Sequence, residues 1–458
     1  MCSRRWVCAM KENAGTANER QRSRSIPTIS AVLPSGALVE MVYDPQERRS
    51  AFAVWQEGAW QIEAKIILDP ARRLVPYSPH NNLLRNEVVL LPSGPAEYES
   101  EEQLIHEVQA FIHRYADLSP IFEQAASYYV LLSWIYDQFS ELPYLRFRGD
   151  PGTGKTRCLL IIGSVCYKPI FASGASTVSP LFRILDAVRG TLIIDEGDFR
   201  VSDERAEVVK ILNNGNARGF PVLRSEVTRE GEFNPRAYAV FGPKLVATRG
   251  AFEDRALESR FLTEEMGQAR LREEVPISLP QRYKEEALVL RNKLLLFRFR
   301  RQGISATAEN LVDRTIEPRL NQIFVPLLSI ISDAGARADL RELAQRYNRE
   351  LVSERGLDAE AHVLEIVLDM LTRDEAATLS VKEITSWFIE RHEPDYERKI
   401  TTKWIGGLIR RRLGLRTQKS HGVYVIPRAE EPKLGRLYDK YGVEPKVTTP
   451  LEPEGVAW

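Results

Sequence analysis

The stretch that decides the fold of this 458-residue chain is Gly149-Asp150-Pro151-Gly152-Thr153-Gly154-Lys155-Thr156. It fits the pattern G-x-x-x-x-G-K-[ST] and lies between a strand-like segment, Tyr144–Arg148, and an apolar helical segment, Cys158–Val165. Glycines let successive backbone N–H groups turn toward a phosphate, and the positive end of the helix dipole adds to the attraction. The pattern therefore predicts a phosphate-binding loop whose residues surround the β-phosphate of a nucleotide.

Two residues of this loop and two carboxylates downstream predict the chemistry of the site. We expect Lys155 to contact the β- and γ-phosphates of ATP and the Thr156 hydroxyl to bind Mg²⁺. The apolar run Thr191–Glu196 (TLIIDE) ends in two acids and resembles a Walker B strand. A buried strand would place Asp195 at the carboxyl edge of a sheet, where it can help to hold Mg²⁺, while Glu196 polarises the attacking water. A surface strand end with two adjacent acids is the alternative.

Charge and composition exclude several classes of protein. Hydrophobic residues make up 43% and charged residues 28%, which is typical of globular proteins. Lys+Arg and Asp+Glu both number 63, so a polyanion has to be met by local basic surface. Four sparse cysteines without a Cys-x-x-Cys pair predict reduced thiols, no zinc site and a cytoplasmic location. No apolar run approaches the ~20 residues of a membrane-spanning helix.

The length predicts several domains, at about 150 residues per domain. Residues 1–25 are basic without an apolar core, so we expect a disordered lead, not a signal peptide, with Met10 as an alternative start. From 144 to 266 strands alternate with helices, which predicts an α/β fold with a parallel sheet. The expected order is 1–25 lead, 26–95 small β-rich domain with a hairpin at Ala51–Leu68, 96–140 helical connector, 141–355 nucleotide-binding core, 356–428 third domain, and 429–458 tail.

Three later features, together with the Walker-like motifs, resemble AAA+ ATPases over residues 144 to about 335. The strand-like Gly242–Thr248 ends in Thr248, at the place of a sensor-1 residue. Ser259-Arg260-Phe261 is similar to the arginine-finger motif of the minichromosome-maintenance helicases, with Arg255 as the alternative finger. Pro318-Arg319 resembles the start of the lid helix that carries sensor 2. The resemblance implies a P-loop AAA+ sheet with a helical lid, catalytic roles for Lys155, Glu196, Thr248 and Arg260, and a nucleotide contact by Arg319.

A predicted hairpin narrows the resemblance to one group of AAA+ proteins. Phe220–Phe241 contains two β-like runs around the turn-forming Thr228–Gly231. It resembles the pre-sensor-1 hairpin of replicative and superfamily III viral helicases, which projects into the channel of a ring. Arginines at its tip and arms could then follow a phosphate backbone: Arg224, Arg229 and Arg236. A solvent-exposed hairpin with ordinary arginines is the alternative.

The carboxy-terminal part is predicted to contain three helices and a short hairpin, and it resembles a winged helix. A winged helix inserts its third helix into the major groove of DNA while the wing touches the backbone. Basic residues occupy both places: Lys399, Lys403, Arg410, Arg411 and Arg412 on the helix and Lys419 on the wing. A helical cap with a solvated basic face is the alternative.

Together these motifs predict a ring-forming AAA+ ATPase, expected to be hexameric, that uses ATP and Mg²⁺ to translocate on DNA. The resemblance is to helicases and replication initiators of phages and mobile elements, which makes a primase or another replication protein a candidate partner. Two alternatives remain. One is a nucleotide-gated DNA-binding loader that unwinds nothing, and the other is an ATPase that remodels proteins.

Overall fold

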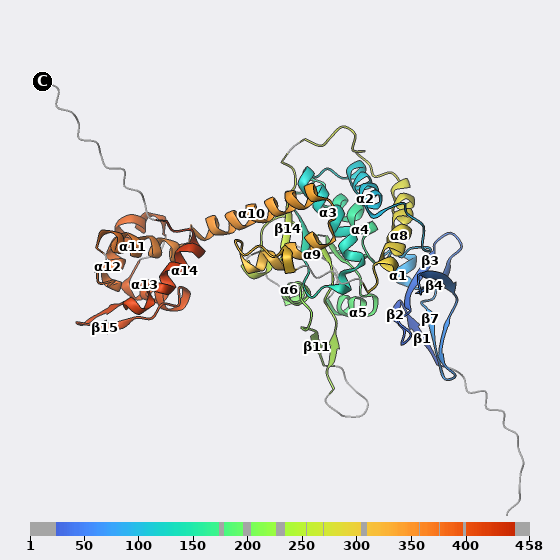
Figure 1. Cartoon of the computed structure of the whole chain (residues 1–458), viewed down its shortest axis with the longest axis horizontal. Coiled ribbons are helices and arrows are strands. Elements are labelled where there is room, and N and C mark those ends of the chain that lie inside the picture. The colour runs from blue at the N-terminus through green and yellow to red at the C-terminus, as the bar shows by residue number, and fades with distance from the viewer. Residues whose placement is uncertain are drawn as a thin grey trace, which may run out of the picture. The chain divides into compact units, whose positions relative to one another are not determined.

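The computed structural model describes residues 24–173, 178–195, 203–225, 234–252, 254–268, 270–303, 309–356, 358–374, 376–396 and 400–444. The chain divides into two compact units (Figure 1). The first comprises Met1–Val312 with Asn321–Arg337, and the second Asp313–Leu320 with Ala338–Trp458. None of the described helices is both long and apolar enough to cross a lipid bilayer.

Two small sheets form the first part of unit 1. One is antiparallel, in the order β2-β3-β4-β5, and the other has the order β1-β7-β6. The predicted hairpin is confirmed, because β4 and β5 are joined at Glu57 and Gly58, which both have positive φ. The strands are β1 Arg24–Thr28, β2 Ser30–Val32, β3 Leu38–Asp44, β4 Arg49–Gln56, β5 Ala59–Glu63, β6 Ile66–Asp69 and β7 Arg72–Pro76.

Helices connect these sheets to the centre of the unit. The short α1 (Asn82–Arg85) is followed by α2 (Glu101–Tyr115), α3 (Pro120–Trp134) and a 3₁₀ turn at Tyr136–Gln138. Ser100 caps α2 by accepting a hydrogen bond from the Gln103 amide, and Pro120 begins α3, where its missing N–H costs nothing. Both helices lie within the segment 96–140, which the sequence predicts to be helical.

The centre of unit 1 is a five-stranded sheet in which all strands are parallel. Its spatial order is β14-β8-β13-β10-β9, so the fourth strand of the series lies between the first and the third. The strands are β8 Tyr144–Arg148, β9 Ile170–Ser173, β10 Leu192–Asp195, β13 Lys244–Thr248 and β14 Phe261–Glu265. The mixed α/β architecture with a parallel sheet agrees with the sequence prediction.

Helices cover both faces of this sheet because side chains of β10 alternate between them. Leu192 and Ile194 belong to the cluster that includes α5 and α6, whereas Ile193 points toward Gly163 of α4 on the other face. The covering helices are α4 Lys155–Val165, α5 Val178–Val188, α6 Asp203–Asn214, α7 Arg255–Glu258 and α8 Arg282–Arg300.

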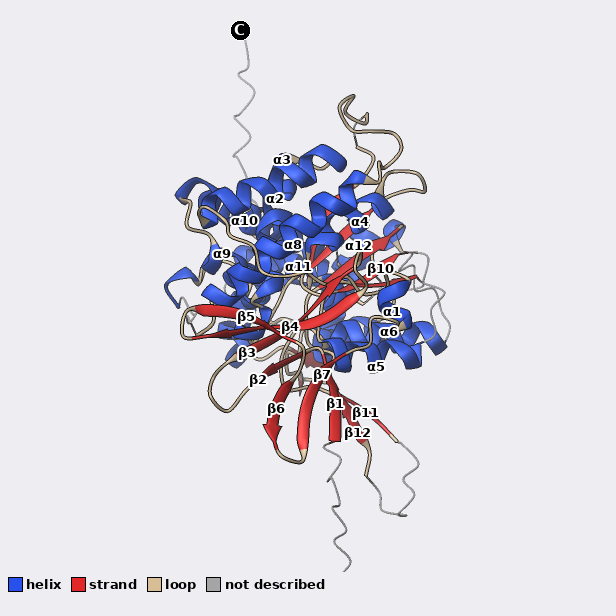
Figure 2. Cartoon of the chain, turned by 90° about the vertical axis from the view of Figure 1, so that its right-hand side faces the viewer, coloured by secondary structure: helices blue, strands red, loops and turns tan. Residues whose placement is uncertain are grey.

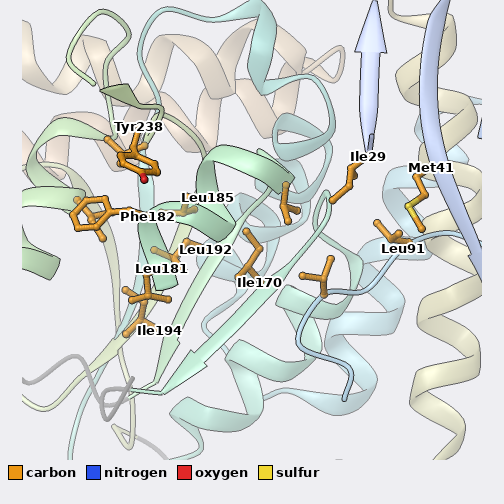
Figure 3. Close-up of a cluster of buried hydrophobic side chains, with 14 of the residues drawn as sticks. Ile29, Met41, Leu91, Ile170, Leu181, Phe182, Leu185, Leu192, Ile194 and Tyr238 are labelled. Carbon is orange, nitrogen blue, oxygen red and sulfur yellow. The ribbon is translucent and has the colours of Figure 1, made fainter. Parts of the chain in front are cut away.

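The amino-terminal sheets and the parallel sheet share one hydrophobic cluster (Figure 3). Ile29, Met41 and Leu91 lie at one end of this cluster, which continues through Ile170 to Leu192. Val89 also forms an antiparallel bridge to Ile170 at the edge strand β9. The β-rich segment predicted at 26–95 is thus present, but it packs in the same compact unit as the nucleotide-binding part.

A buried ionic network strengthens this junction. Glu40 of β3 is 1% exposed and contacts Lys168 Nζ at 2.8 Å and Arg298 Nε at 2.9 Å. Arg298 in α8 also binds Asp137 at 2.6 Å, and the Tyr167 hydroxyl donates to Glu40 at 2.7 Å. Burial lowers the pKa of Lys168, while the charge of Glu40 opposes this shift. Removing one partner would leave an uncompensated buried charge, which typically costs about 3–5 kcal/mol.

The second unit contains the predicted three helices and hairpin. They are α11 Ala359–Arg373, α12 Val381–His392, α13 Thr402–Gly407, which continues as a π-helical turn at Leu408–Arg412, and the pair β15 Gln418–Ser420 and β16 Val423–Val425. Ser380 adds a single bridge to Val425. Two further helices cross the division between the units: α9 Pro318–Ile330 and α10 Ala334–Gly356.

One sequence prediction for this unit is wrong. The tail expected at 429–458 contains a helix, α14 Glu431–Tyr441. Its residues Leu434, Leu437 and Tyr441 recur at helical spacing and are buried in the hydrophobic cluster of this unit. Gly442, at φ 63°, ends the helix. The high Pro, Glu and Lys content obscured this apolar stripe.

Candidate nucleotide site and nucleic-acid surfaces

The predicted phosphate-binding loop connects β8 to α4 at the carboxyl edge of the parallel sheet. Gly149 has φ 155°, and a Cβ there would lie 2.8 Å from the Met266 carbonyl oxygen, so only glycine fits. Gly152 and Gly154 have φ values of 85° and 93°, and Gly154 immediately precedes α4. The glycines therefore give the loop the backbone conformation that the motif predicts. The loop leads directly into the amino end of α4, where the helix dipole favours a bound anion.

Side chains hold the loop in this form. Lys155 Nζ donates to the carbonyl oxygens of Gly149 and Asp150, at 2.6 Å each. The Thr153 hydroxyl donates to the Asp150 oxygen at 2.8 Å. The ammonium group of Lys155 consequently lies beside the loop backbone, where it can neutralise a bound phosphate.

Thr156 and Asp195, predicted to share a metal ion, meet in the structure. The Thr156 hydroxyl donates to Asp195 Oδ2 at 2.8 Å, which joins the first turn of α4 to the end of β10. Hydroxyl and carboxylate oxygens are hard donors, and Mg²⁺ is commonly held by one or two carboxylates plus substrate phosphates. The two residues therefore fit a nucleotide-bound Mg²⁺. Among the described residues no group of three or more His, Cys, Asp or Glu forms a metal site of its own. Glu196 lies outside the described residues.

Thr248 lies between these two elements. It ends β13, which is paired with β8 on one side and β10 on the other, and its carbonyl accepts a hydrogen bond from Gly149 N–H at 3.2 Å. The Thr248 hydroxyl is buried, and it has no hydrogen-bond partner among the described residues. A buried hydroxyl without a partner is costly, so such groups often mark functional sites. Its position suits a residue that contacts a nucleotide or a water molecule.

Arg260 lies at the opposite edge of the sheet. It precedes β14, and its carbonyl accepts from the Tyr144 amide at the amino end of β8. At about 3.3 Å per residue, the five residues of β8 place this point roughly 13 Å from the start of the loop. Arg260 therefore cannot reach the loop of its own chain. Its guanidinium contacts Asn213 Oδ1 at 2.8 Å, Asn216 Oδ1 at 2.9 Å and the Ala256 carbonyl. Arg255 begins α7, and its side chain is exposed.

Arg319 is in the first turn of α9 and belongs to the second unit. Its side chain is half-buried. The structure describes the loop and Arg319 in different units, so the nucleotide contact of Arg319 stays a prediction.

The predicted hairpin is present as β11 (Val222–Arg224) and β12 (Arg236–Tyr238), which project away from the helices in both views (Figures 1 and 2). Arg224 and Arg236 are cross-strand neighbours. Arg224 pairs with Glu207 and lies over the Phe182 ring, and Arg236 pairs with Asp186 at 3.4 Å. The predicted tip residue Arg229 lies outside the described residues.

The basic residues of the second unit occupy its predicted third helix and hairpin. Lys403, Arg410, Arg411, Arg412 and Lys419 are all exposed. Arg412 pairs with Glu360 at 3.2 Å, and Arg410 donates to the Thr417 hydroxyl at 3.4 Å. The surface retains exposed positive charge on both elements. Lys399 lies outside the described residues.

Sequence reasoning missed the two asparagines that contact Arg260. Asn213 is in the last turn of α6, and Asn216 follows the end of that helix, where asparagine is usually explained by helix termination or a turn. Their spacing does not distinguish that role from binding a side chain. The asparagines precede Arg260 by 47 and 44 residues, so no local pattern connects them to it.

Comparison with known proteins assigns no family. No family model matches the chain, and no curated protein matches it. Among solved structures, it is similar to the apo C-terminal region of NrS-1, at 10% identity over 85% of this chain and 96% of that one, with a TM-score of 0.36. JCV helicase is 12% identical over 55% and 62%, with a TM-score of 0.23. Drosophila ORC bound to DNA is 12% identical over 75% and 93%, with a TM-score of 0.20. Because these TM-scores are low, the similarities assign neither a fold nor an activity to this chain.

Proposed function

We propose that this chain is an AAA+ ATPase that hydrolyses ATP at sites shared between subunits of a ring and translocates on DNA. The observation that carries the proposal is the separation of the site's parts within one chain. The loop, Thr156, Asp195 and Thr248 meet at the carboxyl edge of the sheet, while Arg260 lies at the amino edge. A guanidinium at that edge that acts on a nucleotide has to act on that of a neighbouring subunit, and head-to-tail contacts of this kind form a ring where the rotation between subunits closes.

Each residue then has a role in binding or in hydrolysis. The loop amides and Lys155 hold the β- and γ-phosphates, and Thr156 and Asp195 hold Mg²⁺, which neutralises charge on the triphosphate. Glu196 and Thr248 orient the attacking water. Arg260 of a neighbour stabilises charge that develops on the transferred phosphoryl group, and Arg319 contacts the nucleotide from the lid. Hydrolysis is thereby made dependent on assembly.

DNA is the polymer along which we propose that the ring moves. Arg224, Arg229 and Arg236 on the hairpin would contact the backbone of a strand in the ring's channel. The second unit would act as a winged helix that binds phosphates through Lys399, Lys403, Arg410, Arg411, Arg412 and Lys419. Phosphate-dominated binding is strongly salt-dependent, and each neutralised phosphate adds about one to the slope of log affinity against log salt. A mobile-element helicase or replication initiator, with a primase as a partner, would use this combination.

The ion pairs on the hairpin favour a second candidate. Arg224 and Arg236 already contact Glu207 and Asp186, so binding a phosphate there would require these pairs to open. A nucleotide-gated loader would keep them closed and bind duplex DNA through the second unit. Under that function, ATP would control assembly and no strand would be displaced.

A forked-duplex assay separates the two functions. The parent chain with ATP and Mg²⁺ should displace the labelled strand, and Lys155→Ala should not, because it loses the phosphate-binding ammonium. ATP-dependent duplex binding without a displaced strand would favour the loader. ATP turnover that ignores both single-stranded and duplex DNA would contradict both and indicate a protein substrate.

A further inference from the structure

Two asparagines hold the guanidinium of Arg260 from one side. Arg260 Nε donates to Asn216 Oδ1 at 2.9 Å, and Nη1 donates to Asn213 Oδ1 at 2.8 Å. Both asparagines come from the end of α6, and Arg260 comes from the segment between α7 and β14. Two bonds from different nitrogens of one planar group fix its plane as well as its position.

The orientation of the Asn213 amide is itself determined. Asn213 Nδ2 donates to Asp254 Oδ2 at 3.0 Å, which leaves its oxygen to face Arg260. Asp254 in turn caps α7 by accepting from the Ala256 amide at 2.9 Å. The hydrogen bond from Asn213 lowers the pKa of Asp254, with smaller contributions from backbone amides and the charge of Arg260. The carboxylate therefore stays ionised and keeps the amide turned in one direction.

Asn216 is fixed by its backbone. It is 8% exposed, and its carbonyl accepts from the Leu142 amide at 2.8 Å. The carbonyl of the preceding Gly215 accepts from the Gly242 amide at 3.1 Å and from Lys244 Nζ at 3.2 Å. A Cβ on Gly215 would lie 2.6 Å from the Val240 oxygen, so the close approach requires glycine. The residue is thus anchored to the segments that enter β8 and β13.

The asparagine oxygens that contact Arg260 differ from the carboxylates that contact two other arginines of this unit, whereas Arg291 is held by the carbonyl oxygens of Leu91 and Ser164. Arg146 is bound by both oxygens of Glu258, and Arg298 by Glu40 and Asp137. A carboxylate neutralises the guanidinium that it binds, whereas a neutral amide orients it without cancelling its charge. The contacts from Asn213 and Asn216 therefore orient Arg260 without adding a charge of their own.

We propose that Asn213 and Asn216 are positioning residues that hold Arg260 in the geometry needed to act on the neighbouring subunit's nucleotide. This inference rests on the proposed function, because it gives Arg260 its role in trans. Asn213 and Asn216 contact Arg260 at the amino edge, away from the phosphate-binding loop of their own chain, so they should affect the rate of hydrolysis and leave nucleotide binding unchanged.

The first test compares three alanine variants of one segment in the assembled full-length chain. Asn213→Ala and Asn216→Ala should each lower kcat, by up to about 10²-fold for a misplacement near 1 Å, with KM unchanged. Asn214→Ala is the matched control, because Asn214 donates to the Lys210 carbonyl at 2.9 Å and does not contact Arg260. Equal kcat in all three variants, or a rise in KM alone, would overturn the inference.

Mixed assemblies show whether the defect acts in trans. Asn216→Ala retains an intact loop, and Lys155→Ala retains an intact Arg260 with both asparagines. Random mixing of the two in equal amounts should complete about a quarter of the interfaces and restore activity accordingly. No recovery would mean that Asn216→Ala damages its own chain and would overturn the inference. If Asn216→Ala does not fold, the same mixing experiment is done with Asn213→Ala, which changes a more exposed residue.

A parallel mixture of Arg260→Ala with Lys155→Ala shows whether a negative result concerns the role of the asparagines or the proposed function itself. If that mixture recovers activity while Asn213→Ala and Asn216→Ala behave like the Asn214→Ala control, only the positioning role is wrong. If that mixture fails to recover activity, the shared site of the proposed function is wrong.

Discussion

The two edges of the parallel sheet differ in what they can do alone. At the carboxyl edge, hydrogen bonds connect Thr156 to Asp195 at 2.8 Å and the loop to Thr248 at 3.2 Å, in the arrangement that we propose binds the nucleotide. The amino edge, about one strand length away, carries the guanidinium of Arg260, which donates to Asn213 and Asn216. Under the proposed function, the carboxyl edge binds a nucleotide and the amino edge acts on the nucleotide of a neighbouring subunit.

This difference explains why a single chain is expected to bind nucleotide but to hydrolyse it slowly. The rigid sheet keeps the edges apart, because β8 is hydrogen-bonded to β13 and β14 along its length. Only a second chain can bring an amino edge to a carboxyl edge. Changes at the two edges should therefore affect different measured quantities.

The largest expected effect is at the amino edge. Arg260→Ala should lower kcat of the assembled protein by about 10³–10⁵-fold, since an arginine finger contributes on that order, with nucleotide affinity nearly unchanged. Steady-state ATPase assays and a fluorescent-nucleotide titration measure the two quantities. Arg255→Ala is the matched comparison, and a loss confined to that variant would transfer the role to Arg255.

At the carboxyl edge, Thr156→Ala should weaken the binding of Mg²⁺–ATP. It removes the hydroxyl that contacts Asp195, so Mg²⁺ should lose most of its ability to tighten ATP binding, by roughly 10- to 100-fold. Titrations with and without Mg²⁺ measure this change. Thr156→Ser retains the hydroxyl and should behave like the parent, and an equal loss in both variants would contradict the metal role.

A smaller effect at the same edge is expected from Gly149→Ala. The added Cβ would meet the Met266 carbonyl at 2.8 Å in a backbone conformation that favours glycine, and strain of this kind costs about 1–3 kcal/mol. ADP affinity should fall by about 5- to 150-fold, which is the same energy expressed as a ratio. Gly94→Ala, where no atom lies within 4 Å of the new Cβ, should have the parent's affinity.

The last expected effect concerns stability, not activity, and depends on pH at the amino edge. Lys244 Nζ donates to the carbonyls of Gly215, Val240 and Gly242, yet burial lowers its pKa from 10.5 to about 7. Between these values the unfolded chain holds a proton that the folded chain lacks, so the free energy of unfolding should rise with pH from about 7 to 10.5. Thermal unfolding of the parent and Lys244→Met across this range measures the effect. An identical pH dependence in both would contradict it.

The carboxyl edge was predictable from sequence, whereas the amino edge was only partly so. The loop, Asp195 and Thr248 each follow a short apolar strand, and parallel strands bring their carboxyl ends to one edge. The contacts of Arg260 depend on how α6 packs, which no local pattern encodes. Likewise, the sharing of one core between 26–95 and the parallel sheet depends on Glu40 meeting Lys168 and Arg298 across long sequence separations. The helix at 431–441 was missed for a different reason, because composition was weighed above the spacing of its apolar residues.

The most direct test of the shared site is a mixture of two inactive variants. Lys155→Ala retains the amino edge and Arg260→Ala retains the carboxyl edge, so neither should hydrolyse ATP efficiently alone. Mixed in equal amounts and assembled with ATP and DNA, they should regain activity at about a quarter of their interfaces. Recovery of this size is the predicted result. A mixture that stays as inactive as its components, although both variants assemble, would contradict the account.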